Sequence, residues 1–191
     1  MSTLNLKPTH APVKAYYEAL ERFGRGNFDN EGNIRGAFER LLEKCARQFE
    51  WTVVPEYKVS RKGQHPLRVN AGLVDAFNLP RGYWEAKDSK DDLEEEIRKK
   101  FRDGYPRTNI LFQSPGRAIL YQNGSIAFDG GITQPEKLVD VLGLLFEYRE
   151  PHIREWEAAV NEFSTRIPEI ASGAMALIAA ERKTNMTFVE R

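Results

Sequence analysis

The chain has 191 residues, and its 28 basic residues balance its 28 acidic ones. This length suits one ordinary domain with a modest appendage, and a hydrophobic content of 41% is enough to build a packed core. Zero formal net charge argues against a protein that simply coats nucleic acid, because such affinity comes mainly from lysine and arginine.

The amino-terminal segment is predicted to be helical. Residues 1–33 are expected to form an arm, a helix from about Val13 to Phe23 and a loop. The arm carries no apolar secretory region, and no apolar run is long enough to cross a bilayer, so a cytoplasmic protein is expected. A second helix is predicted to end near Glu50, with one apolar face formed by Ile34, Phe38, Leu41, Leu42, Cys45 and Phe49.

Three strands are expected to follow as a meander. The first two are predicted over residues 51–59 and 67–77, joined by a basic turn. Residues 78–82, with the sequence Asn-Leu-Pro-Arg-Gly, are expected to form the hairpin turn into a third strand at 83–87. The meander is therefore predicted to turn twice within about forty residues.

A helix, three short strands and further helices complete the predicted chain. Ser89, with Asp92 three residues later, is expected to cap the helix. Because this helix separates the third strand from the fourth, those two strands can pair in parallel. The later elements are strands at 109–112, 118–121 and 125–128, followed by helices opened by Pro135, Pro151 and Pro168.

This order predicts an α/β fold, with a mixed central sheet flanked by helices and a C-terminal helical extension. Three segments are expected along the chain. Residues 1–33 form the arm and first helix, 34–132 form the core, and 133–191 form a helical extension or connector to further domains.

Two acidic residues are expected to meet across the second hairpin. Alternation along the second strand puts Asp75 on the same face as Leu73 and Phe77, where an uncompensated carboxylate is costly. Glu85 and Lys87 are two residues apart on the third strand, so they share a face. The predicted hairpin can bring Asp75 beside Glu85, so that two carboxylates and an ammonium converge.

Such a convergence suits phosphodiester hydrolysis. Oxygens of Asp75 and Glu85, with the carbonyl of Ala86, are ligands that Mg²⁺ accepts, and Mn²⁺ is expected to substitute. The metal would lower the pKa of a bound water, which Lys87 would orient. An acid-x-Lys triplet alone is a weak signal, because it occurs four times. The competing interpretation is a cross-strand ion pair on a solvated sheet face.

The residues Asp75 and Glu85-Ala86-Lys87, set in the predicted order of helices and strands over about residues 34–112, resemble the PD-(D/E)XK nuclease superfamily. The resemblance implies a restriction-endonuclease-like fold and metal-dependent cleavage of DNA. Val74 stands where the family name has proline. Family members often add a glutamate from the first core helix to the active site. Glu39 is the favoured match for this glutamate, and Glu43 is the second choice. The competing interpretation is that Glu39 is an ordinary surface acid.

A narrower resemblance lies further along the chain. Residues 106–124 look like part of the N-terminal Mrr-like nuclease of single-chain type ISP restriction-modification enzymes. That resemblance implies double-stranded DNA as substrate and little sequence specificity in the nuclease itself. It also implies a helicase-like ATPase, a methyltransferase and a target-recognition domain elsewhere in the same full-length chain.

Alternatives to these readings stay open. A non-cleaving DNA- or partner-binding module could keep the same fold, and a toxin-like or RNA-directed nuclease is a third possibility. A solvated basic turn is the alternative for the residues expected to contact the DNA backbone, which are Arg61, Lys62, Arg68 and Lys90.

Overall fold

The structure is a computed structural model that describes residues 3–25, 31–61, 63–87, 92–149 and 151–184. These fall into two compact units, Met1–Tyr148 and Arg149–Arg191, which are considered separately. None of the described helices is both long and apolar enough to cross a membrane.

The described part of the first unit forms a six-stranded sheet and four α-helices. The strands lie in sequence order, from β1 to β6, and only β3 and β4 run parallel. As predicted, a helix connects these two parallel strands. The elements are α1 (Ala11–Arg25), α2 (Glu31–Ala46), a 3-10 turn η1 (Arg47–Phe49), β1 (Thr52–Arg61), β2 (Gln64–Val74), β3 (Pro80–Ala86), α3 (Leu93–Arg102), β4 (Asn109–Gln113), β5 (Arg117–Gln122), β6 (Ser125–Gly131) and α4 (Pro135–Glu147).

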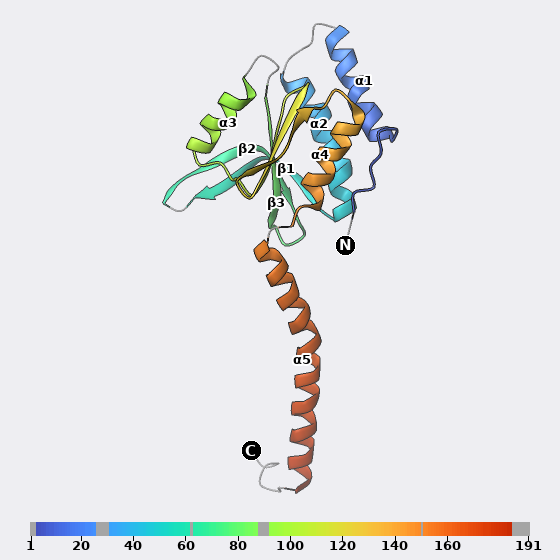
Figure 1. The fold of residues 1–191 in the computed structure, drawn as a ribbon. Helices are drawn as coiled ribbons and strands as arrows, with labels where there is room; N and C mark the ends of the chain where they lie inside the picture. The colour runs from blue at the N-terminus through green and yellow to red at the C-terminus, as the bar shows by residue number, and fades with distance from the viewer. Residues whose placement is uncertain (1–2, 26–30, 62, 88–91, 150, 185–191) are drawn as a thin grey trace. The chain divides into compact units, whose positions relative to one another are not determined.

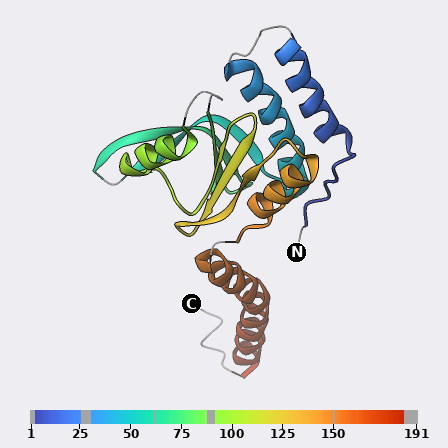
Figure 2. The same ribbon diagram turned by 45° about the horizontal axis from the view of Figure 1, so that its top comes forward.

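Helices cover both faces of the sheet. Helix α3 lies on one face, and α1, α2 and α4 lie on the other (Figures 1 and 2). Two separate apolar clusters result. The α3-side cluster includes Val69, Tyr83, Ile97 and Phe112. The cluster under the other three helices includes Phe38, Leu42, Trp84, Leu120 and Leu142.

Helix α4 belongs to the first unit. Its inner residues Leu138, Val141 and Leu142 are completely buried in the larger cluster. Compact packing of the first unit therefore continues past residue 132, where the sequence pattern places the end of the core.

In the second unit the described residues from 151 onward form one helix, α5 (Pro151–Thr184). The sequence predicts two helices here, with the second opened by Pro168, and that prediction is wrong. Pro168 lies inside the continuous helix, where it removes one backbone hydrogen bond without ending the element.

Helix α3 also begins differently from the prediction. Asp92 is its N-cap, because its carboxylate accepts hydrogen bonds from the backbone N–H groups of Glu94 and Glu95. The predicted cap Ser89 lies outside the described residues. Three acidic residues in the first turn and three basic residues in the last turn complement the helix dipole.

Candidate active site

The turn between β2 and β3 is built around Asp75. The Asp75 carboxylate accepts hydrogen bonds from the backbone N–H groups of Phe77 and Leu79, each at 2.9 Å. It also pairs with the Arg81 guanidinium at 2.6 Å, and both side chains are about nine-tenths buried. Asn78 has a left-handed backbone, which asparagine tolerates in turns. Asp75 is thus fully engaged in holding its own turn.

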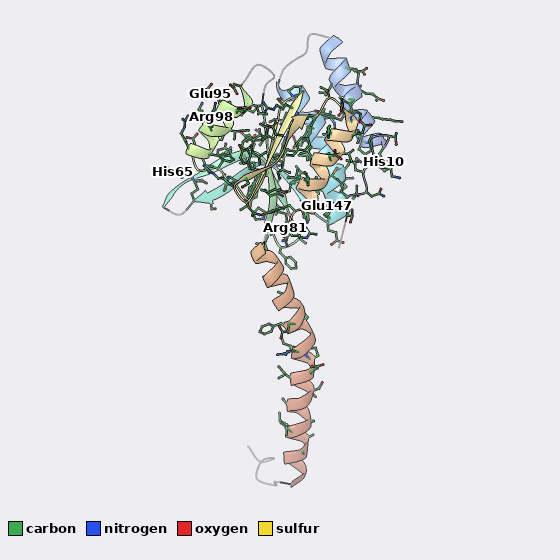
Figure 3. The ribbon with its side chains drawn as sticks, viewed as in Figure 1. His10, His65, Arg81, Glu95, Arg98 and Glu147 are labelled. Atoms are coloured by element: carbon green, nitrogen blue, oxygen red, sulfur yellow. The ribbon has the colours of Figure 1, made fainter. Side chains whose placement is uncertain are left out.

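The strand register places Asp75 far from Glu85. Leu73 pairs with Gly82 and Ala71 with Trp84, so the residue facing Glu85 is Asn70. Asp75 lies beyond the end of β2, five residues from Asn70 and past the register shift at Leu73/Val74. The prediction that the hairpin brings Asp75 beside Glu85 is therefore wrong. Figure 3 likewise shows Arg81, the partner of Asp75, well separated from Glu95 and Arg98 on α3.

The apolar face predicted for the second strand is also interrupted. Val69 packs in the α3-side cluster, whereas Ala71 and Leu73 pack in the opposite one. The change occurs next to Glu56 of β1, whose φ of 50° is left-handed. Strict alternation along β2 therefore fails between Val69 and Ala71.

At Asn70 and Glu85, side-chain hydrogen bonds take the place of the backbone hydrogen bonds that join β2 to β3. The backbone N–H of Asn70 donates to Glu85 Oε2 at 3.0 Å. The backbone N–H of Ala86 donates to Asn70 Oδ1 at 2.7 Å. Glu85 is only 4% exposed, so these bonds satisfy groups that water scarcely reaches.

Glu85, Lys87, Glu96 and Lys100 form a charge cluster between β3 and α3, here called the β3–α3 charge cluster. Lys100 Nζ lies 2.7 Å from Glu85 Oε1, and Lys87 Nζ lies 2.7 Å from Glu96 Oε2. Lys100 also donates to the Tyr105 hydroxyl, which in turn donates to the backbone carbonyl of a β2 residue. Two acids and two lysines leave the cluster without formal net charge.

The pairing stabilises the charged forms of two members. Burial opposes the charge on Lys100, but hydrogen bonds to Glu85 and Tyr105 outweigh it and raise the pKa of the ammonium. The hydrogen bond from Lys87 lowers the pKa of Glu96 against a smaller opposing effect of burial. Both groups are therefore ionised at neutral pH, as the close ion pairs require.

This pairing gives an acid-sensitive contribution to stability. Because the pKa of Glu96 is lower in the folded chain, its contribution is present above the unfolded pKa and is lost as pH falls through the folded value. We expect Glu96→Gln to cost about 0.2–1 kcal/mol at pH 7, the range for partly exposed pairs, and the difference from wild type to shrink below about pH 4. Urea unfolding at several pH values measures it.

The matched control is Glu95→Gln, one residue away on α3 (Figure 3). Glu95 is exposed and forms no side-chain ion pair with a described residue. Its substitution should give a smaller loss at pH 7. Equal losses in the two variants would show that the helix dipole, rather than the Lys87 pair, stabilises Glu96.

The other predicted site residues are scattered. Glu39 and Glu43 are half-buried on α2, and neither forms an ion pair with a described residue. Glu39 lies one turn after Arg35, whose guanidinium contacts Glu56 and the carbonyl of Asn70. Glu39 therefore shares a helix face with a residue that reaches the strand junction.

Of the predicted DNA contacts, two lie within the described residues. Arg61 donates to the carbonyl groups of His65 and Asp103, so its guanidinium joins the turn end of the β1–β2 hairpin to the C-terminal end of α3. Arg68 is exposed. Lys62 and Lys90 lie outside the described residues.

The described residues do not fit the predicted metal site. No group of three or more His, Cys, Asp or Glu side chains within the described part of the chain could hold a metal ion. A divalent cation prefers several oxygen donors, and here Arg81 already compensates Asp75 while Lys100 compensates Glu85. No catalytic step is therefore assigned to a metal.

Sequence reasoning missed Asn70, Glu96, Lys100 and Tyr105. Asn70 carried a usable signal, because an amide interrupts the buried part of β2 as clearly as a carboxylate does. Glu96 and Lys100 are four residues apart on one helix face, a spacing that favours interaction. Nothing in the spacing alone indicates that this face meets Glu85 and Lys87.

Comparison with known proteins adds an independent finding. No protein-family model matches the chain, and no curated protein matches it. Among solved structures, the cryo-EM structure of a DrdV–DNA complex matches with a TM-score of 0.77 and 33% sequence identity. The match covers 91% of this chain and 17% of that chain. It confirms the predicted fold class, a restriction-endonuclease-like α/β fold with a mixed sheet between helices.

Proposed function

We propose that the first unit is a DNA-acting nuclease domain whose reactive centre includes Glu85 and Lys87. The observation that carries this proposal is the likeness to a chain solved in complex with DNA, at 33% identity over 91% of this chain. The β3–α3 charge cluster supports it, because Glu85 and Lys87 lie just past the last backbone pair of β2 and β3, where side-chain hydrogen bonds join the strands.

The chemistry proposed for these residues is limited to their own groups. The Lys87 ammonium is partly exposed and can hold a phosphate oxygen, thereby offsetting the negative charge that develops during hydrolysis. Glu85 is buried and fixed by Asn70 and Lys100, so its carboxylate holds the strand segment that leads to Lys87 in one position. Dependence on Mg²⁺ or Mn²⁺ stays a prediction from the family resemblance.

A wider context is part of the same proposal. The match spans only 17% of the DrdV chain, so the rest of that protein lies outside the shared region. We propose that this domain serves a restriction-modification enzyme of type ISP, with a helicase-like ATPase, a methyltransferase and a target-recognition domain. Cleavage by the full-length protein should then require ATP, and ATP-independent cleavage would argue against this context.

Plasmid nicking tests the nuclease proposal. The wild-type chain, incubated with supercoiled plasmid and Mn²⁺ or Mg²⁺, is expected to nick it slowly. Lys87→Ala should lower the rate about 100-fold or more, the effect of removing one group that stabilises developing charge. Glu85→Gln should also lower the rate, because it removes the carboxylate that pairs with Lys100 and holds the cluster together. Lys58→Ala is the matched control, because exposed Lys58 ends another acid-x-Lys triplet, on β1.

The outcomes separate two functions. Unchanged nicking by Lys87→Ala and Glu85→Gln would exclude the proposed centre. DNA binding in a gel-shift assay without nicking by any variant would favour the second candidate, a non-cleaving DNA-binding module. That candidate is favoured by one observation, namely that every carboxylate of the β3–α3 charge cluster is already paired with a lysine.

A further inference from the structure

We infer that the carboxyl-terminal half of α3 presents a basic surface that holds the backbone of duplex DNA beside the β3–α3 charge cluster. This surface, here called the α3 basic surface, is formed by Arg98, Lys99, Arg102 and Arg107. The inference rests on the proposed function in taking DNA as the partner, and it goes further by naming the face of the domain that meets DNA.

The four residues gather on one exposed part of the molecule. Arg98, Lys99 and Arg102 are exposed on the last turns of α3, and Figure 3 labels Arg98 there. Burial and nearby acids raise the pKa of the Tyr121 hydroxyl, and the guanidinium groups of Arg107 and Arg98 oppose this rise. Both guanidinium groups therefore lie near the same tyrosine, which places Arg107 beside the helix.

The α3 basic surface carries an excess of positive charge in a chain whose formal net charge is zero. Between positions 97 and 107, five residues are basic and only Asp103 is acidic. Lys100 is already paired with Glu85. Neither Arg98 nor Arg102 forms an ion pair with a described residue. A local excess of this kind attracts a polyanion even where the whole protein is neutral.

The helix dipole accounts for only part of this arrangement. Lys99 and Arg102 lie in the last turn of α3, where basic residues complement the dipole. Arg98 precedes that turn and Arg107 follows the helix, so the dipole favours them little. Arg98 and Arg102 are also four residues apart, a spacing at which two like charges destabilise a helix. A phosphate bound between them would remove this repulsion.

Lys99 connects the α3 basic surface to the β3–α3 charge cluster. Its Nζ lies 3.8 Å from Glu96 Oε1, and Glu96 Oε2 lies 2.7 Å from Lys87 Nζ. Lys99 remains 61% exposed in this position, so its ammonium is open to a further anion. DNA held by the surface would therefore lie next to the proposed reactive centre.

The aromatic rings at this surface favour duplex DNA over a single strand. Proteins bind single strands largely by stacking bases on accessible aromatic rings. Here Phe101 and Tyr121 pack edge to face with centroids 4.8 Å apart, and the Arg107 guanidinium lies 4.5 Å from the centroid of Phe101. The rings are thus engaged with each other and with arginine, and the groups left for contact are cations, which bind backbone phosphates.

Acidic residues limit the surface to one half of the helix. Glu94 and Glu95 are exposed in the first turn of α3, where they would repel phosphates. Arg117 does not reverse this, because its guanidinium is paired with Glu94 and Asp129. DNA is therefore expected along the carboxyl-terminal half of α3 and not along its first turn.

Duplex binding at several salt concentrations tests the inference. Fluorescence anisotropy with a labelled duplex and the purified 191-residue chain should show about tenfold weaker binding by the triple variant Arg98→Gln/Lys99→Gln/Arg102→Gln at about 50 mM salt. The plot of log affinity against log salt should become shallower by about 2 to 3, because each phosphate contact contributes about 0.9. Arg98→Lys/Arg102→Lys keeps the charges and should keep the affinity.

The matched control removes three positive charges from the opposite face of the sheet. It is the triple variant Lys14→Gln/Arg22→Gln/Lys137→Gln, whose positions are exposed on α1 and α4 (Figures 1 and 2). This control has the same net charge as the first triple variant. It should bind the duplex close to wild-type affinity and with the wild-type salt dependence.

Several results would overturn the inference. These are equal affinities of the two triple variants, a wild-type chain that does not bind the duplex, tighter binding of a single strand than of the duplex, and a loss of affinity without a change in salt dependence. Plasmid nicking separates this inference from the proposed function. Duplex binding through the α3 basic surface without any nicking contradicts only the nuclease proposal, whereas nicking with equal binding by both triple variants contradicts only this inference.

Discussion

Asp75→Ala is expected to lower the free energy of unfolding by about 3 kcal/mol. The substitution removes a nearly buried carboxylate that accepts two backbone N–H bonds and pairs with Arg81. Loss of one partner from a buried ion pair costs about 3–5 kcal/mol, and the turn bonds add to this cost. Relaxation of the exposed turn tip, where Phe77 is 72% exposed, places the estimate at the lower end. Urea unfolding followed by circular dichroism measures it.

Asp75→Asn is the matched control. It keeps an oxygen for the turn N–H groups and loses only the charge opposite Arg81, so we expect a cost of about 1–2 kcal/mol. If Ala and Asn cost the same, the turn bonds contribute nothing. If neither variant changes stability but both abolish nicking, Asp75 belongs to the reactive centre and the observed register does not describe the active enzyme.

The location of this turn decides which residue faces Glu85. The sequence predicts this turn at residues 78–82, because asparagine, proline and glycine are strong turn residues. In the structure the turn is built on Asp75, and Pro80 already begins β3. A few residues of difference in the turn move the partner of Glu85 from Asp75 to Asn70.

The strand order and helix faces were predictable for a different reason. Hydrophobic periodicity identifies which faces are buried, and burial leaves few ways to arrange a helix between two parallel strands. Phe38, Leu41 and Leu42 are buried on α2 as their spacing predicts. The predicted fold depends on such averages over many residues, so an error in one turn does not affect it.

The candidate site depends instead on single residues. The left-handed Glu56, which accompanies the change of face in β2, has no sequence signature, because glutamate rarely adopts that conformation. The pairing of Lys100 with Glu85 and of Lys87 with Glu96 depends on how α3 docks on the sheet. Periodicity predicts that α3 docks there, but not the angle or register that selects these partners.

Trp84→Ala is the second substitution expected to have a large effect, about 3–5 kcal/mol of lost stability. Trp84 is completely buried, and its ring stacks on Phe38 with centroids 5.3 Å apart. Removing it leaves a cavity between α2 and β3 that the close-packed surroundings can only partly fill. Urea unfolding followed by circular dichroism measures the loss.

Trp84→Phe distinguishes packing from hydrogen bonding at this position. The indole Nε1 of Trp84 makes no hydrogen bond to a described residue, so phenylalanine leaves no acceptor unsatisfied and should cost only about 1–2 kcal/mol. Trp84 and its neighbour Glu85 point to opposite faces of β3, which means that the packing under α2 fixes the strand on which the β3–α3 charge cluster is built. Trp84→Ala should therefore also weaken the effect of Glu96→Gln, because a loosened β3 no longer holds Lys87 against α3. A full Glu96→Gln effect in the Trp84→Ala background would show that α3 positions the cluster independently of the core.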